Sequence, residues 1–413
     1  MNEAPVFREL QAVILVGGRG TRLGNLTETT PKPLIEVGGK PFLAHLIANL
    51  VRHGFRDIVL LAGYRADQLV ALAGRSAEFG ARITCIIEPE PAGTAGALLH
   101  ARDRLAPEFL LLNGDSLLDL NYLDLRLPTL GASGLIGRVA LRPVADASRY
   151  GTVALAGERI TAFAERPPGP GPGLINGGIY WLDRAVLDAI GPGFCSLERD
   201  VLPRLASAGQ LAGRAYDGYF IDIGIPADLA RAQTEVPRQM RRPAVFLDRD
   251  GVLNVDSGYV HRPADIVWID GAKDLVRQLN DAGALVFVVT NQAGVARGFY
   301  TEADVQALHA WMQMELQAVG AHVDAWRYCP YHPDGTVERY RKAHDWRKPA
   351  PGMLRDLLQS WDVDSSRSLM IGDKSIDVEA AIAAGLPGHQ FKGGSLLEFA
   401  RPRLPSLQPR EAA

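Results

Sequence analysis

The sequence predicts an α/β chain that folds as two doubly wound domains. Two short apolar runs, 12–18 (AVILVGG) and 244–251 (AVFLDRDG), are rich in branched or aromatic residues, and each ends in a polar loop. Such runs are typical of the first strand of a parallel sheet. After each run, helix-like and strand-like segments alternate, which is the order that produces layered α/β domains. The 413 residues are also enough for two or three domains.

Further elements follow in the same alternating order. In the first half we expect one helix and two buried strands, over 41–54, 57–63 and 109–115. In the second half we expect the same set, over 271–283, 284–292 and 368–374.

The boundary between the halves is marked by composition. A helical stretch ends near Pro237 and is followed by a basic, proline-punctuated segment. The predicted organisation is a first domain over 1–237, a linker over 238–243, a second domain over 244–395 and a flexible, proline-rich tail over 396–413.

The composition is that of an ordinary globular protein. Hydrophobic residues make up 47% and charged residues 22%, and the formal net charge is −3. We therefore expect neither nucleic acid nor membrane as a partner. The three cysteines are widely spaced and odd in number, which argues for a reducing compartment. The sequence shows no signal-peptide pattern and no apolar run of the roughly 18 residues that a membrane span needs, so we expect a cytoplasmic protein.

A glycine-rich loop, GGRGTRL (17–23), follows the first predicted strand. Missing side chains let backbone N–H groups approach an anion closely, so the loop is a candidate phosphate cradle. A glycine cluster alone could equally well be a plain turn or a phosphate-binding loop. Arg22 and Lys32 favour the phosphate interpretation, because they would supply fixed positive charge during phosphoryl transfer. The spacing fits neither a Walker A loop nor a dinucleotide-binding fingerprint.

Two aspartates of this half are candidate metal ligands. Asp115 follows an apolar run, and Asp222 occupies a second position of the same kind. Both are therefore expected at the carboxyl ends of strands, where ligands gather in open α/β sheets. Taken alone, Asp115 has a plain turn residue after a strand as its alternative interpretation. Two converging carboxylates suit one Mg²⁺, which takes few protein oxygens and completes its shell with phosphate and water.

The motifs GGxGTRL and TxxxPKPL make most of residues 10–235 similar to the sugar-phosphate nucleotidyltransferases, which have a Rossmann-like (GT-A-like) fold. Segments resembling later elements of that family follow in the right order: EPEPAGTAGAL, LLNGDSL, INGGIYWL, SLERDVLP and GYFIDIGIP. The resemblance implies that Mg²⁺ on Asp115 and Asp222 orients a sugar phosphate for in-line attack, and that Lys32 and Arg22 stabilise the transition state and the departing pyrophosphate.

The same resemblance implies contacts with nucleotide and sugar from Gly17, Gly18, Gly20, Thr21, Gly63, Glu88, Gly93, Thr94, Gly96, Glu165, Arg166, Asn176 and Gly177. Arg166 is a departure, because the family often has a lysine there that reaches the sugar phosphate. Lysine and arginine differ in geometry.

In the second half, Asp248 and Asp250 lie two residues apart just after the first predicted strand. Alternate residues of an extended segment point to one side, so both carboxylates can face one pocket. One can attack phosphorus while the other moves protons. The DxD pattern alone is also common in plain metal sites and surface turns. Thr290, Lys348 and Asp373 favour catalysis, because they add a hydroxyl, a cation and a third carboxylate at later strand ends or loops.

This set is similar to the haloacid dehalogenase (HAD) superfamily of phosphatases, over roughly residues 244–391. The resemblance implies that Asp248 is the nucleophile that forms an aspartyl-phosphate and that Asp250 is the general acid and base. It also implies that Asp373 binds Mg²⁺ together with Asp248 and the Asp250 carbonyl, and that Thr290 and Lys348 bind the transferring phosphoryl group. The short connection after the DxD segment implies a HAD-like fold without a large cap.

Agreement beyond these residues narrows the resemblance to the D-glycero-D-manno-heptose 1,7-bisphosphate phosphatases, with histidinol phosphatases as near relatives. It is carried by DRDGVLNVDSGYV, TNQAGVARGFY, CPYHPDG, RKPAPGM and IGDKSIDVEAA. It implies substrate contacts from Asp256, Ser257, Gly258, Tyr259, Asn291, Gln292, Ala293, Arg297, Arg347 and Lys374.

One loop departs from that family. Cys329, Tyr331, His344 and Trp346 stand where its members commonly carry cysteine and histidine ligands to zinc. Tyrosine and tryptophan are not standard zinc ligands, so we expect no zinc and hypothesise that aromatic packing of Tyr331 and Trp346 closes the loop. Cys329 is then a small buried apolar residue. The nearby His332 leaves open whether this loop binds any metal.

Together the two resemblances imply a bifunctional enzyme of nucleotide-activated heptose biosynthesis, with Mg²⁺ in both domains. The phosphatase would release a heptose 1-phosphate, and the nucleotidyltransferase would consume it with GTP as the expected donor. One alternative is a transferase for mannose 1-phosphate or another hexose 1-phosphate, joined to a histidinol-phosphate-type or other sugar phosphatase. The other is a silent domain that binds sugar nucleotide as a regulatory module. The base, the anomer, channelling and a homo-oligomeric state stay open.

Overall fold

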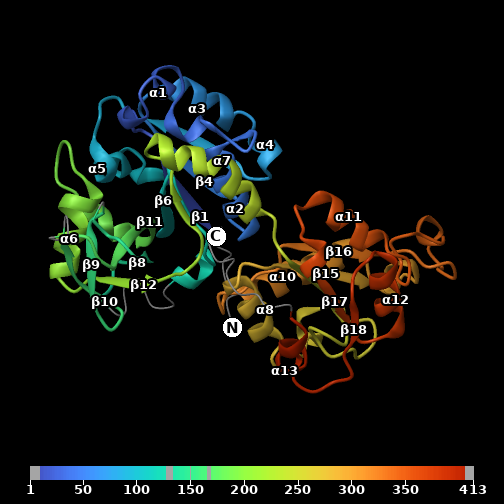
Figure 1. Cartoon of the computed structure of the whole chain (residues 1–413). Helices are drawn as coiled ribbons and strands as arrows, with labels where there is room; N and C mark the ends of the chain where they lie inside the picture. The colour runs from blue at the N-terminus through green and yellow to red at the C-terminus, as the bar shows by residue number, and fades with distance from the viewer. Residues whose placement is uncertain (1–9, 127–133, 149, 165–168, 405–413) are drawn as a thin grey trace. The chain divides into compact units, whose positions relative to one another are not determined.

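The computed structural model divides the chain into two compact units, Met1–Arg238 and Gln239–Ala413, each built around its own sheet (Figure 1). It describes residues 10–126, 134–148, 150–164 and 169–404. Helices and strands alternate in both units, which confirms the α/β class. No helix within the described ranges combines the length and the apolar content needed to cross a membrane.

The first unit contains a nine-stranded sheet. Its strands, in spatial order, are β5 (Arg82–Ile87), β4 (Asp57–Ala62), β1 (Gln11–Leu15), β6 (Glu108–Asn113), β11 (Gly173–Asp183), β8 (Gly137–Val144), β12 (Leu211–Ala215), β10 (Arg159–Ala164) and β9 (Thr152–Ala156). The first four strands are parallel, whereas β11 runs antiparallel to both of its neighbours β6 and β8. The sheet is therefore doubly wound at one end and mixed at the other.

Two small sheets and a set of helices complete this unit. The small sheets pair β13 (Phe220–Asp222) with β7 (Ser116–Leu118), and β2 (Glu36–Val37) with β3 (Lys40–Pro41). The helices are α1 (Leu26–Thr29), α2 (Phe42–Arg52), α3 (Ala66–Ala73), α4 (Ser76–Phe79), α5 (Gly93–His100), α6 (Leu202–Ser207) and α7 (Pro226–Met240).

The parallel strands are buried on both faces, because their side chains alternate and both alternating sets are apolar. Val13 and Leu111 belong to one core cluster, together with Leu98 of α5 and Leu202 of α6. Their neighbour Ile14 points to the other face and is also fully buried. The carboxyl ends of these strands, where the loops emerge, are left for ligands.

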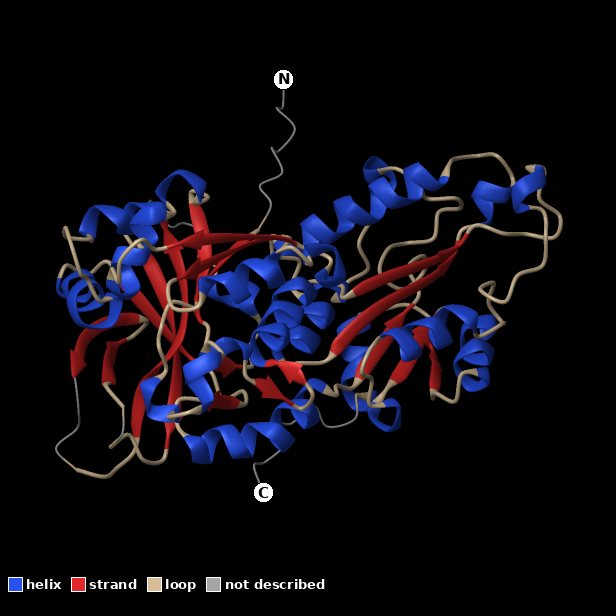
Figure 2. Ribbon diagram, turned by 90° about the horizontal axis from the view of Figure 1, so that it is seen from above, coloured by secondary structure: helices blue, strands red, loops and turns tan. Residues whose placement is uncertain are grey.

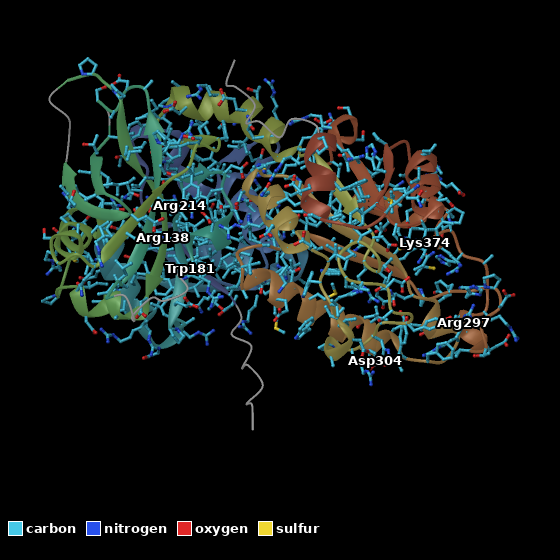
Figure 3. The ribbon with its side chains drawn as sticks, turned by 90° about the horizontal axis from the view of Figure 1, so that it is seen from below. Arg138, Trp181, Arg214, Arg297, Asp304 and Lys374 are labelled. Carbon is cyan, nitrogen blue, oxygen red and sulfur yellow. The ribbon has the colours of Figure 1, made fainter. Side chains whose placement is uncertain are left out.

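A polar cluster lies on the mixed side of the same sheet, where Asp124 and Arg138 are buried and Arg214 is exposed. Arg138 of β8 stands opposite Trp181 of β11, and Arg214 lies on β12, as the labels in Figure 3 show. Arg214 Nη1 donates to Asp124 Oδ1 (3.0 Å) and Arg138 Nη1 donates to the Asp124 carbonyl (3.2 Å). Buried charges are tolerated where they are paired and hydrogen-bonded in this way.

The second unit contains a five-stranded parallel sheet in the order β16 (Ala325–Cys329), β15 (Leu285–Asn291), β14 (Ala244–Leu247), β17 (Leu369–Gly372) and β18 (Gly388–Gln390). Its helices are α8 (Ala272–Asp281), α9 (Ala293–Ala296), α10 (Glu302–Gln317), α11 (Gly352–Ser360), α12 (Ser375–Ala383) and α13 (Leu396–Ala400). Residues 248–271, which follow β14, hold one short 3₁₀ helix and no separate domain, as the capless fold requires.

Alternating side chains of this sheet enter two separate cores. Val245 and Val286 pack with residues of α8 and α10, whereas Phe246 and Phe287 pack with residues of α11 and α12. Figure 2 shows helices along both faces of these strands. Such two-sided cover is the arrangement of a doubly wound domain.

Helix α7 and the predicted tail both differ in detail from the sequence expectation. Helix α7 runs through Pro237 to Met240, and the proline ring lies against Gly38, where a Cβ would collide with it. The predicted tail also begins too early. Residues 396–400 form α13, and Leu396 and Ala400 are fully buried in the core beside α8. The high proline content of this segment predicted a flexible tail, although residues 396–400 pack against the core. Residues 405–413 lie outside the described part of the chain.

Candidate functional site

A cavity of about 760 Å³ opens at the carboxyl ends of the parallel strands in the first unit. Many of the predicted nucleotide-site residues line it: Gly17, Gly18, Gly20, Thr21, Arg22, Lys32, Gly63, Glu88, Gly93, Thr94 and Asp115. Others are not among its described lining residues: Gly96, Asn176, Gly177 and Asp222. Glu165 and Arg166 lie outside the described residues.

Lys32 is the buried cation of this cavity. Only 6% of the residue is exposed, and its Nζ lies 2.7 Å from Asp115 Oδ2 and 3.4 Å from Asp222 Oδ1. The two carboxylates therefore converge, as the sequence predicts. Burial, and then the charge of Asp115, raise the pKa of Asp222. Two carboxylate oxygens close together are suitable ligands for Mg²⁺, so these residues fit the predicted ion.

Asp222 reaches this place by a route that the sequence does not reveal. It ends β13, which belongs to a separate two-stranded sheet and not to the main one. Antiparallel pairing sets Asp222 opposite Ser116, and Ile223 N donates to the Asp115 carbonyl (3.0 Å). The pairing of β13 with β7 therefore places the Asp222 carboxylate close to Asp115.

Thr94 and Asn176 make contacts within the protein. Thr94 Oγ1 donates to Glu198 Oε2 (2.7 Å) and accepts from Leu197 N (2.8 Å), so its side chain ties α5 to the segment that starts at Ser196. Asn176 Nδ2 donates to Tyr180 Oη (2.7 Å) within β11. Their predicted sugar or nucleotide contacts remain predictions.

Arg19, Tyr64, Arg65 and Phe194, to which the sequence analysis assigned no individual role, also line the cavity. Arg19 and Arg65 each place a guanidinium 5.8 Å from the ring centre of Tyr64, and the exposed Phe194 forms part of the wall. Arg65 has a φ of 52°, unusual for a residue with a side chain, and donates to the Glu28 carbonyl (3.0 Å). The sequence GYR (63–65), directly after a buried strand, could have indicated Tyr64 and Arg65.

A second cavity, of about 240 Å³, lies at the carboxyl ends of β14 and β15 in the second unit. The predicted residues that line it are Asp248, Asp250, Asp256, Gly258, Tyr259, Thr290, Asn291, Gln292, Ala293, Lys348 and Lys374. Ser257, Arg297, Arg347 and Asp373 are not among its described lining residues. Because β15, β14 and β17 are parallel neighbours, the residues that follow them meet at one edge.

Lys348 joins the carboxylates of this edge. It is 2% exposed, and its Nζ lies 2.9 Å from Asp248 Oδ1 and 2.6 Å from Asp377 Oδ1. Burial raises the pKa of Asp248 to about 7. Burial lowers the pKa of Lys348, but Asp248 and Asp377 outweigh it and raise the value overall.

Asp248, Asp373 and Asp377 form a candidate metal centre. Each offers a carboxylate oxygen, and these atoms lie within 4.8 Å of one another. Gly251, with a φ of 85°, makes room, because a Cβ there would lie 2.5 Å from Asp373 Oδ2. Three hard oxygen donors fit the predicted Mg²⁺. Asp377 was missed in the sequence, although its place four residues after Asp373 at a helix start was a usable signal.

The side-chain amides of Gln292 and Asn291 make hydrogen bonds within the protein. Gln292 Nε2 donates to Asp250 Oδ2 (3.0 Å) and Thr290 Oγ1 (2.9 Å), while its Oε1 accepts from Tyr300 Oη (2.7 Å). Asn291 exchanges two 3.1 Å hydrogen bonds with the Lys348 backbone. Both amides therefore position catalytic groups in this structure, and both residues also line the cavity, so their expected substrate contacts remain predictions.

Charged and aromatic groups form the rim of the second cavity. Lys374 Nζ lies 3.0 Å from Asp256 Oδ2, and the ring of Tyr259 packs edge-on against Phe299 at 4.7 Å. Arg297 places its guanidinium 5.9 Å from the Tyr259 ring centre. Figure 3 labels Lys374 and Arg297 on this unit. Both cations remain candidates for binding a phosphate group.

The loop after β16 is closed by stacked rings. Tyr331 stacks on His344 at 4.4 Å, and His344 meets Trp346 edge-on at 6.3 Å. Tyr331 and Trp346 also pack against the core that contains Cys329. This geometry supports the hypothesis that aromatic packing closes the loop. Burial raises the pKa of the Cys329 thiol, which disfavours the thiolate that a metal would need.

Two α/β units that gather carboxylates and a buried lysine at their strand ends define an enzyme of phosphorus chemistry. A family model described as nucleotidyl transferase matches residues 11–239, and one described as HAD-hydrolase-like matches residues 345–400. The D-glycero-beta-D-manno-heptose-1,7-bisphosphate 7-phosphatase of Rhodopseudomonas palustris is 51% identical over 168 residues, which are 41% of this chain and 93% of that protein.

Two further similarities concern the first unit. The mannose-1-phosphate guanyltransferase of Schizosaccharomyces pombe is 40% identical over 226 residues, which are 53% of this chain and 62% of that protein. The crystal structure of HddC from Yersinia pseudotuberculosis complexed with GMP-PN shows 32% identity and a TM-score of 0.48, over 55% of this chain and 99% of that one. The chain belongs to the nucleotidyl transferase family and, through its second unit, to the family of the heptose bisphosphate phosphatases.

Replacing Asp377 by asparagine is expected to lower orthophosphate release by about 10- to 100-fold at a fixed low Mg²⁺ concentration. The change removes one charge from the three-carboxylate group and from the pair with Lys348. Phosphate release measured across a Mg²⁺ titration should shift to higher Mg²⁺. Glu379→Gln, an exposed position on the same helix, is the control. An identical titration curve for both variants would refute the assignment.

Removing the ring of Tyr331 by substitution with alanine is expected to lower the free energy of unfolding of the second unit by roughly 1–3 kcal/mol. A zinc chelator should leave the wild-type value unchanged, because stacked rings hold the loop. Chemical denaturation with and without chelator measures both effects, and Val267→Ala, which is 61% exposed, serves as the control. One tightly held zinc ion per chain, or destabilisation by the chelator, would contradict the hypothesis.

Proposed function

We propose that this chain is a bifunctional enzyme of nucleotide-activated heptose synthesis. The second unit hydrolyses the 7-phosphate of D-glycero-D-manno-heptose 1,7-bisphosphate. The first unit transfers GMP from GTP to the resulting heptose 1-phosphate and releases pyrophosphate. One observation carries the proposal most strongly: a chain whose second unit is 51% identical to a heptose bisphosphate phosphatase also carries a nucleotidyl transferase domain. The product of one reaction is then a substrate of the other.

The chemistry of the second unit begins at Asp248. Its carboxylate attacks the phosphorus, the bond from phosphorus to the sugar oxygen breaks, and Asp250 gives that oxygen a proton. Water then attacks the aspartyl-phosphate while Asp250 takes up a proton, and orthophosphate leaves. Lys348 and Thr290 lie beside these carboxylates and stabilise the transferring group. Mg²⁺, when bound by Asp248, Asp373 and Asp377, supplies positive charge that offsets the repulsion between anions.

In the first unit, an oxygen of the sugar phosphate attacks the α-phosphorus of the nucleotide, and the bond to the pyrophosphate breaks. The backbone of the loop that begins at Gly17 and the side chains of Arg22 and Lys32 face the cavity in which this occurs. Their positive charge favours the departing pyrophosphate. Asp115 and Asp222 would hold Mg²⁺, which would supply further positive charge beside the phosphates.

A second candidate function uses mannose 1-phosphate or another hexose 1-phosphate in the first unit. It is favoured by the 40% identity to a mannose-1-phosphate guanyltransferase. The purified chain should be incubated with heptose and hexose 1-phosphates, each with GTP, ATP, CTP or UTP, while pyrophosphate release is followed. Highest kcat/KM with a heptose 1-phosphate and GTP supports the first candidate, whereas preference for a hexose supports the second.

Substitutions at the two metal centres should act separately. Asp248→Asn is expected to lower orthophosphate release by at least about 100-fold and to leave pyrophosphate release from GTP intact, because it removes only the nucleophile of the second unit. Asp222→Asn should have the reverse effect. Orthophosphate release is measured with the bisphosphate as substrate, and pyrophosphate release is measured separately with heptose 1-phosphate and GTP supplied directly. Loss of both activities in either variant would contradict independent sites.

A further inference from the structure

A buried arginine lies behind the proposed acid and base of the phosphatase site. Arg249 is fully buried, and its Nε and Nη2 donate to Asp250 Oδ1 (3.1 Å) and Oδ2 (2.8 Å). Nη2 also donates to the Val260 carbonyl (2.7 Å). A buried guanidinium is costly unless each donor finds a partner, so the orientation of this side chain is strongly constrained.

The remaining terminal nitrogen of Arg249 faces a histidine. His309 of α10 is 5% exposed, and its Nε2 lies 3.4 Å from Arg249 Nη1. Burial, and then the charge of Arg249, lower the pKa of His309 well below its usual value, so the ring is neutral. A neutral imidazole has one nitrogen that accepts a hydrogen bond, and here Nε2 is suited to accept from the guanidinium.

Aromatic side chains of β16 fix the position of the His309 ring. Its ring stacks on Trp326 of β16 at 4.5 Å and meets Tyr328 edge-on at 5.9 Å. Helix α10 is fixed at its start by a capping box, in which Asp304 accepts from Thr301 N (2.7 Å); Figure 3 labels this aspartate. A continuous set of contacts therefore runs from the strand β16 through His309 and Arg249 to Asp250.

We propose that His309 and Arg249 are positioning residues of the phosphatase reaction: His309 holds the Arg249 guanidinium against Asp250, and Arg249 stabilises the carboxylate that Asp250 becomes after it has given its proton to the leaving sugar oxygen. This inference rests on the proposed role of Asp250. Neither residue touches the reacting atoms. Both stabilise the negative charge that Asp250 acquires when the bond from phosphorus to oxygen breaks.

The inference predicts an effect that depends on the leaving group. A sugar oxygen is a strong base once released, so its departure requires the proton from Asp250. The p-nitrophenolate ion is a weak base and leaves without a proton. A variant that misplaces Arg249 should therefore slow hydrolysis of a sugar phosphate much more than that of p-nitrophenyl phosphate. General loss of structure would slow both alike.

The test compares His309→Phe, which keeps a ring for Trp326 but removes the acceptor, with His309→Gln, whose amide oxygen can still accept. We expect His309→Phe to lower kcat/KM for a primary sugar phosphate by about 10-fold or more and to change kcat/KM for p-nitrophenyl phosphate by less than about 2-fold, because kcat/KM covers only the steps up to release of the leaving group. His309→Gln should restore most of the loss. His389→Phe, a partly exposed histidine of β18, is the control. Arg249→Lys keeps the charge without the planar fork and should show the same selectivity, which also serves if the phenylalanine variant does not fold.

Equal losses on both substrates, or no loss on either, would overturn the inference. The substrate for the test is whichever primary sugar phosphate the wild-type enzyme hydrolyses best. If that sugar is not a heptose, the proposed substrate is wrong while the positioning role is still tested. If the wild-type enzyme hydrolyses no phosphate ester, both the proposed function and this inference are overturned.

Discussion

In each unit a nearly buried lysine lies between two carboxylates, and the rest of each site depends on that arrangement. The Nζ of Lys32 lies within 3.4 Å of Asp115 and Asp222, and the Nζ of Lys348 lies within 2.9 Å of Asp248 and Asp377. A charge removed from water is costly unless it is paired, and removing one partner leaves the others unbalanced. The strands and loops that carry these groups are therefore held at fixed positions before any substrate arrives.

The fold was largely predictable from the sequence, because the buried parallel strands are visible in it as apolar runs. The strands expected around residues 57, 109, 284 and 368 are present as β4, β6, β15 and β17. The antiparallel β11 in the middle of the first sheet was not foreseen, since strand direction leaves no local pattern. The docking of α13 was also missed, because it depends on contacts with distant residues.

Site residues were predictable where they lie at or just past the carboxyl end of a strand, as Asp115, Asp248 and Thr290 do. Their convergence follows from the geometry of neighbouring parallel strands. The roles of Asn291 and Gln292 could not be derived in this way, since their amides are occupied by Lys348 and Asp250, which come from other parts of the sequence. Arg249 lies in the middle of the DxD segment, yet only the structure shows that it turns inward towards α10. Burial and hydrogen-bond partners are tertiary facts, and residue type alone does not encode them.

The loop that delivers Lys348 to its aspartates is closed by the rings of Tyr331, His344 and Trp346. A loop closed by thiolate ligands opens when oxidants attack its sulfur atoms. Here the sulfur of Cys329 is buried, and burial raises the pKa of its thiol, which disfavours the reactive thiolate. The lysine should therefore keep its position under peroxide concentrations that would release it from a sulfur-ligated loop, so oxidative stress would spare this catalytic group.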